Sequence, residues 1–133
     1  MDAAQYLKEI ETKLIISPAI LSFTVVEEQD LGNRGYFRAR VVLANNDFLE
    51  VSEYFIIDNS KTIPQRYRYQ WMDDTRSILR KRWDNVPHFP TLSNFPHHIH
   101  IASEDNVEPS QALGILEVLK FIEREIEQEI SGT

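Results

Sequence analysis

Residues 36–72 read YFRARVVLANNDFLEVSEYFIIDNSKTIPQRYRYQWM, and three extended segments follow one another in this stretch. β-Branched and aromatic side chains are dense over 36–44, 48–58 and 64–72, a composition typical of strands. The tripeptides Asn-Asn-Asp and Asn-Ser-Lys separate these segments with residues that favour tight turns. Strands joined by such short turns predict an antiparallel meander.

The same strand pattern continues on both sides of this stretch. It predicts further strands over 20–28 and 75–83, and a short one over 98–102. A loop rich in proline is expected over 84–97. The predicted sheet therefore has five to six strands.

Helices are expected at the two ends of the chain, over 3–15 and 109–130. Asp2 can cap the first helix, and Pro109 suits the first position of the second. Each helix carries one apolar stripe. The simplest packing is an α+β fold in which an antiparallel meander sheet has the N- and C-terminal helices packed on one face. Without a linker or repeat, residues 1–133 are expected to form a single domain. Alternatively, the apolar stripe of the C-terminal helix could pack against a second copy of the chain in a homodimer.

Composition limits the classes of function. The 133 residues carry a net charge of −7 and no cysteine, so disulfides, thiolate catalysis and cysteine-bound zinc are excluded. No apolar run approaches the roughly 20 residues that span a bilayer, and the first residues lack the basic start of a signal peptide. We expect a cytoplasmic protein without membrane contact. Residues 61–82 nevertheless hold seven basic and two acidic residues, a net charge of +5 that can attract phosphate.

Strand alternation separates the side chains of this basic block into two faces. Arginines fall on one face, where guanidinium groups can hold phosphate by paired hydrogen bonds. Aromatic residues fall on the other, where Tyr69 and Trp71 either stack on nucleobases or belong to the core. The residues predicted to bind substrate are Arg66, Arg68, Arg80, Arg82, Tyr69, Trp71, Asn85 and His97.

All four histidines lie within thirteen residues, in the sequences RWDNVPH (82–88) and PHHIH (96–100). Histidine exchanges protons near neutral pH, and it also binds metals. Metal-independent RNA cleavage needs a base, an acid and cations at the phosphate. The residues predicted to be catalytic are His88, His98, His100 and Asp84, with Asp84 orienting a histidine.

Other interpretations of this segment remain open. The same His98, His100, His88 and Asp84 could bind a metal ion, although no known zinc signature is present. The histidines could also belong to a polar surface loop, in which Asp84 and Asn85 only shape the turn. The hypothesis of metal-independent RNA cleavage needs no metal and no cofactor.

The segments YRYQW (67–71), RWDNVPH (82–88) and FPHHIH (95–100) together resemble the signature of the TumE family. These are small toxins of toxin–antitoxin modules, and the resemblance covers about residues 20–125. Members often have a second histidine after the first Pro-His, whereas this chain has Phe89. That departure weakens any role that would need histidine at this position.

The resemblance implies a type II toxin whose partner is a helix-turn-helix antitoxin. An RNA target is the common inference for small modules of this kind, and the basic block with its histidines suits it. We therefore expect an endoribonuclease with a histidine and arginine site. The alternatives are a binding module without catalysis, directed at nucleic acid or protein, and a histidine-based metal-binding protein.

Overall fold

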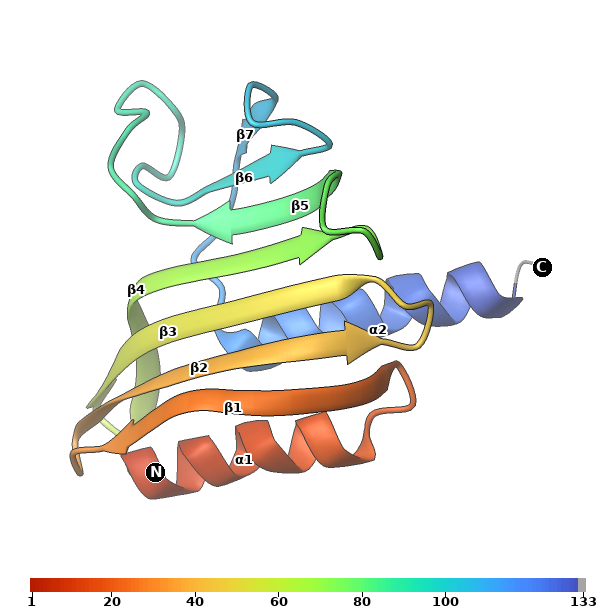
Figure 1. Ribbon diagram of the computed structural model, residues 1–133. Helices are drawn as coiled ribbons and strands as arrows, with labels where there is room; N and C mark the ends of the chain where they lie inside the picture. The colour runs from red at the N-terminus through yellow and green to blue at the C-terminus, as the bar shows by residue number, and fades with distance from the viewer. Residues whose placement is uncertain (132–133) are drawn as a thin grey trace.

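The computed structural model describes residues 1–131 and combines one sheet with two helices (Figure 1). The sheet has seven strands, in the order of the sequence, and every neighbouring pair is antiparallel. The elements are α1 (Ala3–Ile16), β1 (Ile20–Asp30), β2 (Arg34–Leu43), β3 (Phe48–Asp58), β4 (Lys61–Met72), β5 (Leu79–Asp84), β6 (His98–Ile101), β7 (Val107–Pro109) and α2 (Ile115–Ser131). The predicted α+β meander is confirmed.

The sheet has one strand more than the predicted maximum of six. Residues 107–109 pair with β6 as the edge strand β7, so Pro109 ends a strand and does not begin the second helix. An edge strand tolerates proline, because one side of its backbone has no partner. The helix α2 starts later, at Ile115, and the Glu117 side chain accepts a hydrogen bond from the Gly114 backbone.

β5 is shorter than predicted, since it begins at Leu79 and not at residue 75. The Asp73 carboxylate accepts hydrogen bonds from the backbone N–H groups of Ser77 and Ile78 and from the Thr75 hydroxyl. These bonds hold the segment in a turn, in which Arg76 has a φ of 61°.

Both helices cover the same face of the sheet, as predicted (Figure 1). α1 starts at a reciprocal cap between Asp2 and Gln5, and it buries Tyr6 and Ile10. The apolar stripe of α2 covers the chain's own sheet. Its buried residues are Ile115, Val118, Leu119, Ile122 and Ile126. Within residues 1–131, no helix is long and apolar enough to cross a bilayer.

The opposite face of the sheet carries polar side chains in rows set by the strand register. One row crosses five strands, and each residue lies directly opposite the next. It consists of Arg38, Ser52, Arg68, Asp84 and His98. A neighbouring row ends with Gln70, Arg82 and His100. We call this surface the open face, and it brings Arg68 and Arg82 next to Asp84, His98 and His100.

Candidate active site

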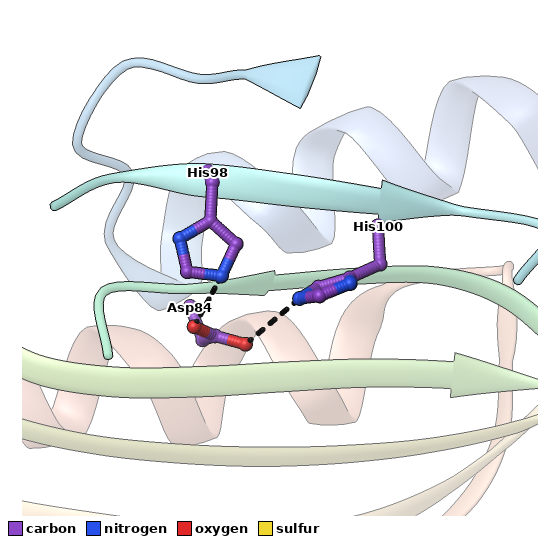
Figure 2. A group of neighbouring side chains, drawn as sticks. All are labelled: Asp84, His98 and His100. Atoms are coloured by element: carbon purple, nitrogen blue, oxygen red, sulfur yellow. Dashed lines mark ion pairs between the residues drawn. The ribbon is translucent and has the colours of Figure 1, made fainter. Parts of the chain in front are cut away.

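Three buried polar side chains meet on the open face, where β5 and β6 pair. Figure 2 shows His98 and His100 pointing from β6 toward Asp84 on β5. Asp84 Oδ1 lies 2.8 Å from His98 Nε2, and Asp84 Oδ2 lies 3.6 Å from His100 Nε2. All three residues are at most 4% exposed. Buried polar groups of this kind must be paired, which fixes their geometry.

The second nitrogen of each imidazole is bound to a backbone carbonyl. His98 Nδ1 lies 2.9 Å from the Pro96 carbonyl oxygen, and His100 Nδ1 lies 2.9 Å from that of Glu104. A carbonyl only accepts hydrogen bonds, so both Nδ1 atoms carry the proton. Both Nε2 atoms therefore face the Asp84 carboxylate. At 2.8 Å, the contact to His98 needs a proton or another cation between the two atoms.

Arg82 and Glu104 complete the wall beside this cluster. The Arg82 Nε lies 3.2 Å from Asp84 Oδ2, and its two terminal nitrogens lie 2.5 and 2.6 Å from the Glu104 carboxylate oxygens. This paired hydrogen bond raises the pKa of Arg82 and lowers the pKa of Glu104. Asp84 also accepts a hydrogen bond from the Val86 N–H at 3.1 Å. The carboxylate is thus held from several sides.

A cavity of about 360 Å³ opens onto the cluster. Arg68 and the exposed His88 contribute to its walls, together with the paired Arg82 and Glu104. Phe89 covers the imidazoles from the loop, with its ring centroid 5.0 Å from that of His98 and 6.0 Å from that of His100. A small polar ligand entering this cavity would meet two guanidinium groups, three imidazoles and the carboxylates of Asp84 and Glu104.

The family model described as Toxin TumE matches residues 7–130, nearly the whole chain. This chain belongs to the TumE family. It is accordingly a toxin of a toxin–antitoxin module, and its family implies an antitoxin partner. No curated protein and no solved structure matches it.

In this TumE chain, several residues predicted to bind substrate lie away from the cavity. Tyr69 and Trp71 are buried against the helices, where the Tyr69 hydroxyl donates to the Leu113 carbonyl and the Trp71 Nε1–H donates to Asp47. Arg80 pairs with the same Asp47 carboxylate at 3.2 Å. These three side chains therefore hold other parts of the fold.

His97 and Asn85 also have partners outside the cluster. His97 Nδ1 lies 2.9 Å from the Tyr67 hydroxyl, and its ring stacks on Tyr67. Burial, followed by the charge of His98, lowers the pKa of His97. The Asn85 amide bonds to the backbone of β4, at Gln65 and Tyr67. Arg66 and Arg68 lie on the open face, as strand alternation predicts.

Glu104 and two tyrosines of the open face were not predicted from the sequence. Glu104 stands in a polar connection whose composition gives no sign of its pairing with Arg82. Tyr36 and Tyr54 lie opposite each other in the strand register and border the arginines. Tyr36 and Tyr54 alternate along their strands with buried Phe37 and Phe55. Strand alternation in this TumE sequence was therefore sufficient to predict that both tyrosines lie on the open face.

Proposed function

We propose that this TumE toxin cleaves RNA as an endoribonuclease, with the cavity beside Asp84, His98 and His100 as its active site. The observation that carries the proposal is the position of this buried cluster at the end of an arginine row. Arg68 lies directly opposite Asp84, so a phosphate held by Arg68 would be next to the imidazoles. Guanidinium groups suit phosphate because they bind its oxygens in pairs and stay charged.

The histidine geometry suggests which nitrogen takes the first proton. His100 keeps its proton on Nδ1, so Nε2 offers a lone pair, and at 3.6 Å from Asp84 it is outside hydrogen-bond distance. We assign His100 as the base for the ribose 2′-hydroxyl. The Asp84 carboxylate then stabilises the imidazolium that forms, and His98 holds Asp84 in place.

His88 is assigned as the acid. Within residues 1–131, its imidazole has no hydrogen-bond or ion-pair partner, and it is exposed at the cavity wall. In the proposed step the 2′-oxygen attacks phosphorus and the bond to the 5′-oxygen breaks. His88 gives its proton to the leaving 5′-oxygen, and Arg68 and Arg82 stabilise the phosphate charge. The products are a 2′,3′-cyclic phosphate and a 5′-hydroxyl.

A metal-assisted form of the same reaction is the second candidate, and one observation favours it. Asp84, His98 and His100 can each offer one ligand atom, and these atoms lie within 4.8 Å of one another. Metal-binding histidines commonly donate their other N–H to a carbonyl, as both do here. A divalent ion such as Zn²⁺ would have three protein ligands and an open position.

Growth inhibition and total RNA, measured after induction, test the proposal. Wild-type protein should stop growth and produce new RNA fragments, while His100→Gln should do neither. His97→Gln is the matched control, because this neighbouring histidine contacts Tyr67 outside the cavity. A His100→Gln protein that keeps its melting temperature and still fragments RNA would disprove the assigned role. Inhibition without RNA fragments would disprove the nuclease.

Cleavage assays with purified protein distinguish metal-independent from metal-assisted cleavage. Cleavage that survives EDTA supports proton transfer by the histidines alone. Cleavage that EDTA abolishes and Zn²⁺ or Mn²⁺ restores supports the metal-assisted form. RNA that is bound but never cut would indicate a binding module without catalysis.

The partner and the location follow from the same proposal. We propose a helix-turn-helix antitoxin that neutralises the toxin by covering the open face with an acidic segment, since charge complementarity favours such pairing. The site of action would be the cytoplasm, where RNA is available.

A further inference from the structure

A second hollow lies on the open face, directly beside the proposed active site. It has a volume of about 380 Å³ and shares Arg68 and Val86 with the catalytic cavity. Its other walls include Tyr36, Tyr54 and Arg66. The two hollows are therefore adjacent on the sheet surface.

The strand register explains why these residues gather. Tyr36 lies opposite Tyr54, and Tyr54 lies opposite Arg66, in one row across β2, β3 and β4. The row that contains Arg68 and Asp84 is its neighbour on the same face. Tyr54 is two strands away from Asp84 and one row along the strands. With about 4.8 Å between paired strands and about 3.4 Å per residue, the two backbone positions lie roughly 12 Å apart.

Among the described residues, no carboxylate is bonded to the two arginines of this hollow, Arg66 and Arg68. Within residues 1–131, the Arg66 guanidinium makes no hydrogen bond or ion pair. Arg68 donates a hydrogen bond to the neutral Gln70 amide oxygen at 2.7 Å. Its interaction with Glu104 is electrostatic, without a hydrogen bond. By contrast, Arg38 and Arg40 on the same face both pair with Glu50. The hollow therefore keeps positive charge available for an anion.

The tyrosines offer ring surface next to these cations. Tyr36 and Tyr54 are partly buried, and the Tyr36 hydroxyl lies 2.9 Å from the Ser52 hydroxyl, which fixes its ring. Stacking on an aromatic ring binds any nucleobase without selecting its sequence, and arginine binds the adjoining phosphate. Aromatic rings and unpaired arginines together match one nucleotide of a single strand.

We propose that this hollow binds an unpaired nucleotide of the RNA, next to the one whose phosphate enters the catalytic cavity. Its base would stack on Tyr36 and Tyr54, and its phosphate would contact Arg66 and Arg68. This inference rests on the proposed function only for the identity of the substrate. It adds a preference for single-stranded RNA, because paired bases in an A-form helix do not expose their faces.

Binding of a fluorescent, mixed-sequence, single-stranded oligoribonucleotide tests the subsite. The oligonucleotide carries 2′-O-methyl groups, so that the wild-type protein cannot cleave it by 2′-hydroxyl attack. Tyr54→Leu should raise the Kd roughly tenfold or more, whereas Tyr54→Phe, which keeps the ring, should bind like wild type. Arg66→Ala should also weaken binding, and Arg124→Ala on α2 should have no effect. Melting temperatures verify that the variants fold.

The outcomes separate this inference from the nuclease proposal. Equal Kd values for Tyr54→Leu and wild type would overturn the subsite and leave RNA cleavage standing. Weaker binding by Tyr54→Leu, in a protein that never cuts unmodified RNA, would support the subsite and reject the nuclease. Duplex RNA bound as tightly as the single strand would also overturn the subsite. Absence of any RNA binding by wild type would reject both.

Discussion

Glu53 is a carboxyl group inside the core, between β3 and the two helices. It is 0% exposed, and its Oε2 accepts a hydrogen bond from the Tyr6 hydroxyl at 2.6 Å. Among the described residues, its Oε1 has no hydrogen-bond partner. Burial raises the pKa of Glu53 from 4.5 to about 7, because a charged carboxylate loses its hydration there. A single residue thus makes the stability of the fold depend on pH.

The sign of this dependence follows from proton binding. Between pH 4.5 and 7 folded Glu53 keeps a proton that the unfolded chain has released, so stability falls as the pH rises through this window and stays low above it. The loss is on the order of 3 kcal/mol. Glu53→Gln should remove it and make the protein more stable than wild type at pH 8.

Urea unfolding of both proteins at pH 5 and pH 8 measures the effect. The pKa of Glu28 is also raised to about 7, by partial burial and by Glu11. Glu28 therefore also lowers the stability of the fold as the pH rises. The difference between wild type and Glu53→Gln isolates Glu53. An equal pH dependence in the two proteins would contradict the prediction.

At the scale of elements, the amide side chain of Asn85 fastens the start of the loop over 85–97 to β4. Opposite Tyr54 and Phe55 the register of β4 shifts, and Gln65 is the extra residue of this bulge. The Asn85 amide donates to the Gln65 carbonyl at 2.8 Å and accepts from the Tyr67 N–H at 3.0 Å. Asn85 thereby continues the pairing of β4 where β5 ends, and it fixes the start of the loop that carries His88.

Asn85→Ala should lower the free energy of unfolding by about 1–2 kcal/mol, because it removes both hydrogen bonds and leaves the Tyr67 N–H without this acceptor. Urea midpoints of wild type and Asn85→Ala measure the difference. A midpoint of Asn85→Ala equal to that of wild type would show that the amide does not fasten the loop.

At the scale of the molecule, charge is divided between the two faces of the sheet. The chain has a net charge of −7, and α2 exposes Glu117, Glu127 and Glu129 on the helix side. The open face carries the arginine rows set by the strand register. An RNA strand would be repelled from the helices and attracted to the open face, so net charge does not exclude nucleic acid.

The salt dependence of RNA binding tests whether RNA binds on the open face. Affinity should fall as salt rises, because bound phosphates release counterions. Arg66→Ala and Arg68→Ala should each reduce the slope of log K against log salt by about 1. Lys8→Ala and Lys120→Ala, exposed on the helices, should leave the slope unchanged. Equal effects from both pairs would contradict binding on the open face.

The sequence by itself determined the order of the elements other than β7, the two-layer fold and the face on which Arg66 and Arg68 lie. Strand alternation and helical periodicity are local patterns, so they need no knowledge of distant residues. The sequence motifs were also sufficient to indicate the TumE family. The catalytic roles of His88, His98, His100 and Asp84 remain predictions.

Only the tertiary structure decided which side chains meet. The pairing of β5 with β6 puts Asp84 opposite His98 across a loop, and sequence spacing does not specify such a register. The chain path after β6 brings the Glu104 carboxylate to Arg82 and the Glu104 backbone carbonyl to His100. The carbonyl holds the imidazole proton of His100 on Nδ1. Pro109 likewise lies in a strand because residues 107–109 pair with β6. These are long-range or backbone contacts, and they depend on the folded chain because no local pattern encodes them.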